Sequence, residues 1–168
     1  MPETLPILPL RNTVLFPGVV IPITAGRDKS IQLIKDANNG KKVIGVVSQK
    51  DETVENPTLE DINTLGTVAR ILRVLQMPDG NTTIIIQGKK RFEVDAMLRE
   101  SPYMEATVKE VAETRPENLD DEFTAILDSI KDLALQIIKE SPNIPTEASF
   151  AIKNIESSSF LINFISSN

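Results

Sequence analysis

Two reactive residue types are missing from this chain of 168 residues, which contains neither cysteine nor histidine. The absence of cysteine excludes disulfides, thiolate metal sites and cysteine nucleophiles, and it is compatible with a reducing cytoplasm. The absence of histidine excludes a Ser-His-Asp triad, a histidine metal ligand and a histidine general base. The commonest routes to hydrolytic and metal-dependent chemistry are therefore closed to this chain.

Aromatic residues are also scarce, at 4% of the chain against 40% for all hydrophobic residues, so we expect a core of Ile, Leu and Val. The formal net charge is −6, which argues against non-specific binding to nucleic acid or to anionic membranes. No apolar run approaches the ~20 residues that a membrane-spanning helix needs, and Met1–Leu10 has no signal-peptide pattern. We therefore expect a soluble, cytoplasmic protein without membrane contact.

The first part of the chain has the patterns of β-strands. Leu5–Leu10 mixes apolar residues with prolines, which is typical of an edge strand. Gly66–Met77 and Thr82–Gln87 flank the turn sequence PDGN at 78–81 and predict a hairpin, and Gly66 indicates a bulge or a close backbone approach. Further strands are expected within the remaining β-prone runs: Val14–Phe16, Val19–Thr24, Val43–Val47, Arg91–Leu98 and Tyr103–Val111.

One helix is expected among these strands. Asp28 can cap it, and Ile31 and Ile34 lie on its apolar face. The sequence NNG at 38–40 contains residues that tolerate the left-handed conformation, so it can end the helix. The only helix of the first part is therefore predicted between residues 28 and 40.

The character of the chain changes near residue 117. Apolar residues from Leu119 to Ile138 recur at steps of three and four, which predicts an amphipathic helix of about five turns. Thr146 is expected to start another helix, and the apolar segment Phe160–Ile165 ends the sequence. Residues 1–117 carry 15 basic and 16 acidic residues, whereas residues 118–168 carry 3 and 8. We therefore expect a β-rich domain at 1–117 and an acidic helical subdomain at 118–168.

Motifs for catalysis and for nucleotide binding are lacking, since the chain has neither a P-loop nor a Gly-x-Gly-x-x-Gly sequence. The acidic groups at 51–52 and 60–61 flank a loop, and the group at 120–122 suits a helix start, where the dipole favours negative charge. Lys29 and Ser30 could form a dyad without histidine, but adjacent helical side chains point about 100° apart. We predict no catalytic, cofactor-binding or metal-binding residue, and no enzyme activity for this chain alone.

A basic cluster, Lys89–Arg91, follows Gly88 and could contact an anion or a nucleic acid. The first 117 residues offer only Phe16, Phe92 and Tyr103 as stacking aromatics, and nothing resembles an aromatic platform for bases. We therefore interpret the cluster as a solvated turn between strands and expect no nucleic-acid partner.

Six short segments of the first part occur together, in the same order, in one protein family. They are LPILPLRNTVLFPGVVIPI at 5–23, GRDKSI at 26–31, VSQKD at 47–51, LGTVARI at 65–71, MPDG at 77–80 and QGKKR at 87–91. They resemble the N-terminal domain of the Lon ATP-dependent protease family, with Asp28 where that family commonly has Glu. With the strands around them they cover roughly residues 5–111, and their order makes the resemblance specific.

The resemblance implies an α+β fold. A curved, barrel-like antiparallel β domain of the pseudouridine-synthase-and-archaeosine-transglycosylase (PUA) type, with one helix, would precede the start of a helical bundle. In the Lon family this region lies ahead of an ATPase module, which would use ATP and Mg²⁺, and of a Ser-Lys peptidase module. Neither motif set occurs here, so we expect a truncated fragment of a longer ATP-dependent endopeptidase, with a stand-alone Lon-domain protein as the alternative.

The resemblance implies that this region recognises unfolded or degron-bearing proteins. The whole protein, a homo-hexamer, would then degrade misfolded and regulatory proteins. An unfolded client offers apolar side chains and unpaired backbone, so it would meet exposed apolar residues or an open strand edge. The candidate contacts lie in the first turn, the GRDKS motif and the hairpin tip: Phe16, Pro17, Val19, Val20, Arg27, Lys29, Met77 and Pro78. The alternative is an assembly module, whose acidic helical part docks subunits with little client contact.

Overall fold

The computed structural model describes residues 3–117, 120–145 and 147–167. The chain divides into two compact units, Met1–Ala112 and Glu113–Asn168. The first unit contains the strands β1 (Thr4–Leu10), β2 (Val20–Ala25), β3 (Val43–Ser48), β4 (Leu65–Gln76), β5 (Thr82–Arg99) and β6 (Glu105–Val111), the helix α1 (Asp28–Asn39) and the short 3-10 helix η1 (Leu59–Asp61). The second unit contains the helices α2 (Asp121–Glu140), α3 (Glu147–Asn154) and α4 (Ser158–Ser167).

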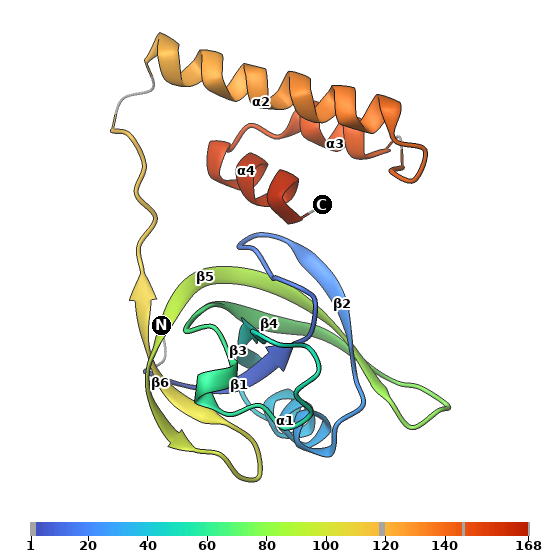
Figure 1. Ribbon diagram of the computed structural model, residues 1–168, viewed down its shortest axis with the longest axis vertical. Helices are drawn as coiled ribbons and strands as arrows, with labels where there is room; N and C mark the ends of the chain where they lie inside the picture. Colours follow the sequence, from blue (N-terminus) through green and yellow to red (C-terminus); the bar gives the residue numbers. More distant parts are fainter. Residues whose placement is uncertain (1–2, 118–119, 146, 168) are drawn as a thin grey trace. The chain divides into compact units, whose positions relative to one another are not determined.

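The sheet of the first unit closes on itself (Figure 1). Its strand order is β2-β5-β4-β3-β1-β6, and β6 also pairs with β5, so five strands form a ring that β2 extends. This confirms the α+β class and the barrel-like shape. The sheet is mixed rather than antiparallel, however, because β1 and β3 run parallel. A parallel pair needs a long crossover connection, which β2 and α1 form between them.

Strand β1 lies inside the sheet, although its prolines predicted an edge strand. Thr4–Pro6 pair with β6, and Ile7–Leu10 pair with β3. The Ile7 N–H donates to the Met104 carbonyl on the β6 side, so by alternation the nitrogen of Pro6 faces away from β6 and that of Pro9 faces away from β3. Each proline thus lies where its half of the strand needs no N–H donor. The edge-strand prediction is wrong because two neighbours divide one strand between them.

The segment Val14–Phe16 is irregular, although its composition predicted a strand. The carbonyl groups of Thr13 and Leu15 accept from side chains instead of from a neighbouring strand. Ser48 Oγ donates to the Thr13 carbonyl at 2.6 Å, and Thr67 Oγ1 donates to the Leu15 carbonyl at 2.7 Å. Because every buried carbonyl needs a donor, these two hydroxyl groups allow the chain to cross the barrel surface without joining the sheet.

Strand β5 runs unbroken through Lys89–Arg91, so the solvated turn predicted there is wrong. The strand is long because it changes partners partway along its length. Thr82–Gln87 pair with β2, and Arg91–Arg99 pair with β6 on the same side. Gly88 lies at this exchange, where it packs against the turn that leads into β2.

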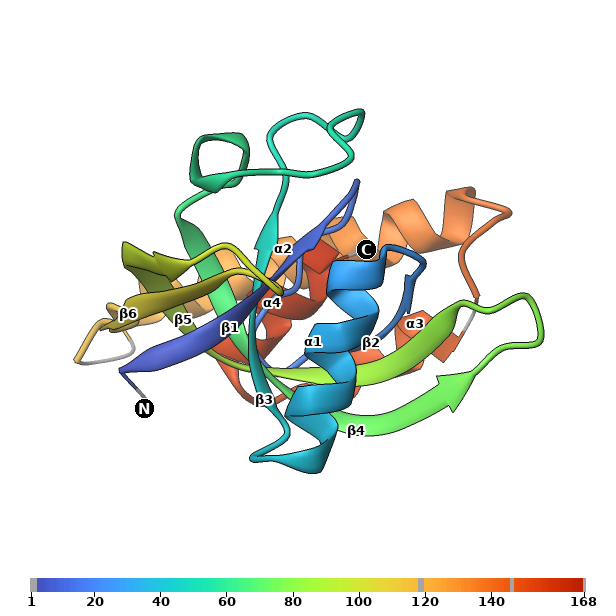
Figure 2. The same ribbon diagram turned by 90° about the horizontal axis from the view of Figure 1, so that it is seen from below.

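Helix α1 packs one face on the barrel (Figure 2), where Leu33 and Ile34 join the core formed by β1, β3, β4 and β5. Asp28 does not cap it, because the N-cap residue is Arg27 in an extended conformation with no side-chain cap hydrogen bond. Asp28 lies one residue later, in the first turn, where a negative charge still suits the helix dipole. The helix ends where expected, but the left-handed residue beyond it is Lys42, with φ 58°.

The β4–β5 hairpin is confirmed, with Gln76 paired to Thr82. The Met77 N–H donates to the Asn81 carbonyl at 2.9 Å and closes the turn. The prediction of a close approach at Gly66 is also confirmed, because a Cβ at that position would lie 2.5 Å from the Val46 carbonyl oxygen. Glycine is therefore required where the start of β4 lies against the backbone of β3.

The second unit is helical, and α2 confirms the amphipathic pattern from Asp121 onward, whereas Leu119, where the predicted pattern begins, lies outside the described residues. Asp120 caps α2 by accepting a hydrogen bond from the Phe123 N–H at 2.7 Å, which supports the helix-start interpretation of the acidic group. The buried centre of the unit contains Ala134, Ile152 and Leu161. Helix α4 contains the predicted apolar segment, whereas Thr146, the expected start of a helix, lies outside the described residues.

Candidate functional sites

The turn that leads into β2 is fixed to β5 at Gly88. The Gly18 N–H donates to the Gly88 carbonyl, and the Gly88 N–H donates to the Val19 carbonyl, each at 2.9 Å. A Cβ at position 88 would lie 2.3 Å from the Phe16 carbonyl oxygen. The absence of a side chain at Gly88 therefore lets the turn lie directly on the strand.

Only part of this predicted contact site is accessible. Pro17 and Val19 are buried, Phe16 is half-buried, and Val20 exposes 48% of its surface. Pro17 and Val19 thus pack as core residues in the isolated chain. Val20 and the open edge of Phe16 are the parts of the turn that another molecule can reach.

An apolar patch borders the turn, and sequence reasoning missed two of its members. Val14 and Leu65 are 55% and 49% exposed. With Phe16 they line a shallow pocket of about 150 Å³, and the Arg91 guanidinium lies 6.0 Å from the centre of the Phe16 ring. Val14 was read as a strand residue and Leu65 as part of a family motif, so neither pattern indicated exposure. We call Val14, Phe16 and Leu65 the apolar patch.

The hairpin tip presents the other predicted apolar contacts. Met77 is 44% exposed and Pro78 is exposed. The Asn81 N–H and side-chain amide each donate to the Asp79 carboxylate at 3.0 Å, which stiffens the turn behind these residues. The tip can therefore offer a flexible, polarisable Met side chain on a fixed backbone.

The turn and the hairpin tip lie at opposite ends of β2. Val20 pairs with Gln87, and Ala25 pairs with Thr82, which directly follows the hairpin turn. Five residue steps at about 3.3 Å each separate these ends by about 17 Å. The structure therefore does not bring the predicted contacts into one site, but places the first turn before one end of β2 and the hairpin tip beyond its other end.

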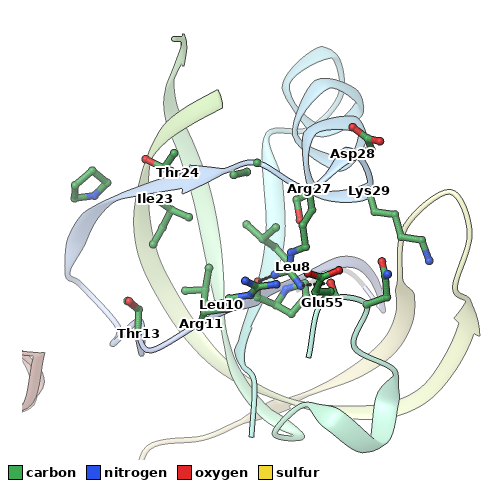
Figure 3. Close-up of a pocket in the computed structure, with 16 residues that line it drawn as sticks. Leu8, Leu10, Arg11, Thr13, Ile23, Thr24, Arg27, Asp28, Lys29 and Glu55 are labelled. Atoms are coloured by element: carbon green, nitrogen blue, oxygen red, sulfur yellow. Dashed lines mark hydrogen bonds between the residues drawn. The ribbon is translucent and has the colours of Figure 1, made fainter. Parts of the chain in front are cut away.

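Arg27 lies at the wall of an open pocket of about 930 Å³ (Figure 3). Its Nη1 donates to the Glu55 carbonyl and its Nη2 to the Pro9 carbonyl, both at 3.1 Å. Burial of the guanidinium, and then the positive charge of Arg11, lowers the pKa of Arg27 from its ordinary value. Lys29 is exposed at the same pocket, so the structure brings the two GRDKS candidates together.

The loop that supplies the Glu55 carbonyl is held by its own hydrogen bonds. The buried Gln49 side chain donates from Nε2 to the carbonyls of Asp51 and Val54 at 3.1 and 2.9 Å. Thr53 donates to the Asp51 carboxylate from its hydroxyl and its backbone, which lowers the pKa of Asp51. Sequence reasoning missed this loop as a pocket wall, because no local pattern joins residues 27 and 55.

The basic cluster on β5 has partners of its own. Lys89 Nζ donates to Gln87 Oε1, and Lys90 Nζ pairs with Glu110 Oε1, both at 2.7 Å on the exposed surface.

No group of three or more Asp or Glu side chains that could hold a metal ion occurs among the described residues. In residues 3–117, 120–145 and 147–167, no helix is long and apolar enough to cross a membrane.

The fold and these sites define an α+β domain that presents apolar and cationic side chains on a closed barrel, which is the arrangement of a binding domain. Residues 4–168 match the model of the ATP-dependent protease La (LON) substrate-binding domain. The chain therefore belongs to the family of Lon substrate-binding domains.

Relatives and solved structures agree with this family. The chain is 73% identical over 168 residues to a Lon protease of Flavobacterium johnsoniae, covering 100% of this chain and 21% of that protein. It is 51% identical over 167 residues to a Lon protease of Cytophaga hutchinsonii, covering 99% and 20%. The chain thus spans about a fifth of the length of the curated relatives that it matches.

Two solved structures share the fold at low sequence identity. The N-terminal domain of a Mycobacterium avium complex Lon protease has a TM-score of 0.75 at 22% identity, over 96% of this chain and 80% of that chain. A Lon N-terminal domain protein from Xanthomonas campestris has a TM-score of 0.60 at 19% identity, over 92% and 91%. At these identities the likeness shows the fold alone.

Proposed function

We propose that this chain recognises and holds unfolded or degron-bearing protein clients for a Lon-type ATP-dependent protease, and that it does no chemistry itself. The observation that carries the proposal is the exposure of two large apolar side chains on backbone fixed by hydrogen bonds, Val20 at the start of β2 and Met77 in the hairpin turn beyond the other end of β2. Exposed apolar side chains on a rigid scaffold favour contact with the apolar residues of an unfolded chain.

The spacing of these contacts sets the length of client that can use both. Strand β2 alone spans about 17 Å, or about five extended residues, and Met77 lies farther away, on the turn after β4. A client segment of about eight residues would reach from Val20 to Met77, whereas a segment of about four would reach only one of them. Each contact alone is weak, and joining two in one client raises the affinity through effective concentration.

The proposal is tested by binding of labelled unfolded protein to the chain, measured by fluorescence anisotropy. Val20→Ser and Met77→Ser should each weaken binding about fivefold, from the loss of about 1 kcal/mol of apolar burial. Leu98→Ser is the matched control, because Leu98 is 55% exposed on the distal part of β5. Equal binding by all three variants and the original chain would contradict a role for these contacts.

A second candidate function, subunit assembly, rests on one observation in α2. Ile126, Leu133 and Ile137 are 53%, 60% and 59% exposed, and their spacing of seven and four residues puts them on one helix face. An apolar stripe of this kind suits helix packing between subunits. Analytical ultracentrifugation of the chain tests this function, because Leu133→Asp should lower the association state if the stripe joins subunits.

The role of the whole protein is proposed on the same basis. We infer that the parent is a cytoplasmic, homo-hexameric Ser-Lys endopeptidase that degrades misfolded and regulatory proteins with ATP and Mg²⁺. The absence of cysteine fits a reducing compartment. Degradation of an unfolded client by the full-length protein, with and without residues 1–117, tests whether this part of the chain delivers the client.

A further inference from the structure

The open pocket beside Arg27 gathers positive charge in an acidic chain. Arg11, Arg27 and Lys29 line it with two acidic residues, Asp28 and Glu55, which leaves a formal excess of one positive charge. The chain as a whole carries −6. The pocket therefore differs in sign from the protein around it and favours an anionic group.

Neither Arg11 nor Arg27 takes part in an ion pair with a carboxylate in the described part of the chain. The ion pairs found there involve Lys90, Arg99, Lys109 and Arg115. Arg27 spends one N–H of each terminal nitrogen on a backbone carbonyl. A guanidinium has five N–H donors in a fixed plane, so three remain. The two carbonyls hold this plane in position, which reduces the entropy that a ligand would otherwise lose on binding.

The rest of the pocket wall is mixed, because Thr13, Thr24, Ser30 and Asn56 line it beside the apolar residues. The side chains of Leu8, Leu10 and Ala25 are buried, and Ile23 is half-buried. Figure 3 shows Leu8 and Leu10 close to the arginine side chains, and Ile23 on β2. A ligand that fits this pocket would place a negative charge next to an apolar group.

We propose that the pocket between Arg11 and Arg27 binds the C-terminal carboxylate of a peptide client whose last side chain is apolar. The carboxylate accepts hydrogen bonds from the free N–H groups of the two guanidinium groups. The last side chain packs toward Leu10 and Ile23. This inference rests on the proposed function, and it names one chemical feature by which a client would be recognised.

The charge of the pocket favours a carboxylate over a polyanion. An excess of one positive charge balances one carboxylate, whereas a nucleic acid would bring several phosphates close to Asp28 and Glu55. The rest of the acidic chain would repel those phosphates as well. Pro22 and Ile23 give the pocket an apolar surface beside the arginines, which suits the side chain next to a peptide carboxylate.

The test compares two labelled peptides of about ten residues that end in leucine, one as the free acid and one as the amide. The free acid should bind the chain about tenfold more tightly, because the amide loses charge-assisted hydrogen bonds. Arg11→Gln should remove this preference, and because Arg11 is exposed, the variant should fold normally. Arg73→Gln, which removes the same charge from an exposed position of β4, should retain the preference.

Competition separates the other sources of negative charge. Excess unlabelled free-acid peptide should displace the labelled one, whereas an amidated peptide with an internal aspartate, inorganic phosphate and single-stranded RNA should not. Displacement by any of these three, or equal affinity for the acid and the amide, overturns the assignment. Two results together would reject this site and leave the proposed function standing. The free-acid peptide would show no advantage over the amide, and unfolded protein would bind equally well to the Arg11→Gln chain and to the original chain.

Discussion

Gly88→Ala is the substitution that most directly perturbs the turn that carries Phe16 and Val20. The new Cβ would lie 2.3 Å from the Phe16 carbonyl oxygen and 3.3 Å from the Pro17 Cα. Both neighbours are backbone atoms, so the turn must move away from β5. That movement breaks the two hydrogen bonds of Gly88, which contribute about 0.5–1.5 kcal/mol each.

We expect the free energy of unfolding of the Gly88→Ala chain to fall by about 2 kcal/mol, from the two lost hydrogen bonds and the clash. Urea denaturation followed by circular dichroism measures the change. Gly80→Ala is the control, because a Cβ there meets nothing within 4 Å and only the φ of +88° opposes it. That conformation costs about 1 kcal/mol, so a loss at Gly88 no greater than the loss at Gly80 would refute the packing argument.

Three further predictions concern the core, the cap of α2 and the charge of one loop. Phe92→Ala should lower the free energy of unfolding of the barrel by about 3–5 kcal/mol in urea denaturation, because Phe92 is fully buried; a loss below about 1 kcal/mol would contradict its place in the core. Asp120→Ala should lower the free energy of unfolding of the helical unit by about 1 kcal/mol, because the cap hydrogen bond is lost. Faster amide hydrogen exchange at Phe123 would show this loss. The pKa of Asp51 is lowered, so its contribution to stability is present above the ordinary carboxyl pKa and is lost as the pH falls through the lowered value. Thr53→Ala should raise that pKa toward the ordinary range in an NMR titration, and an unchanged pKa would refute the hydrogen-bond cause.

The elements that the sequence predicted well are those whose signals are local. The β4–β5 hairpin follows from a turn sequence between two β-prone runs, and α2 follows from apolar residues on one face. The helix start at the acidic group 120–122 and the close approach at Gly66 also follow from residue type and position. Such features depend on neighbours within a few residues, which the sequence displays directly.

The features that sequence reasoning missed depend on partners far along the chain. The parallel β1–β3 pair needs a crossover of some thirty residues, and prolines alone cannot reveal that β1 has a different neighbour at each half. The hydrogen bonds of Arg27 reach the carbonyls of Pro9 and Glu55, 18 and 28 residues away. Backbone carbonyls are present at every residue, so no pattern of side chains marks these two.

The candidate contacts were predicted by residue type and motif, which do not report exposure. Pro17 and Val19 are buried, whereas Val14 and Leu65 are exposed and were not predicted. Exposure depends on whether the turn lies on β5, and that in turn depends on Gly88. The apolar surface of the barrel could therefore be located only in the folded chain.

The most direct test of the proposed function is to map an unfolded client on the chain by NMR. Amide chemical shifts of the 168-residue chain would be followed while an unfolded peptide of about eight residues is added. The proposed function predicts that the amides of Val20 and Met77 shift together, since a segment of this length spans β2 and reaches the hairpin turn beyond it. Shifts confined to α2, or no shifts at saturating peptide, would contradict client recognition by the barrel.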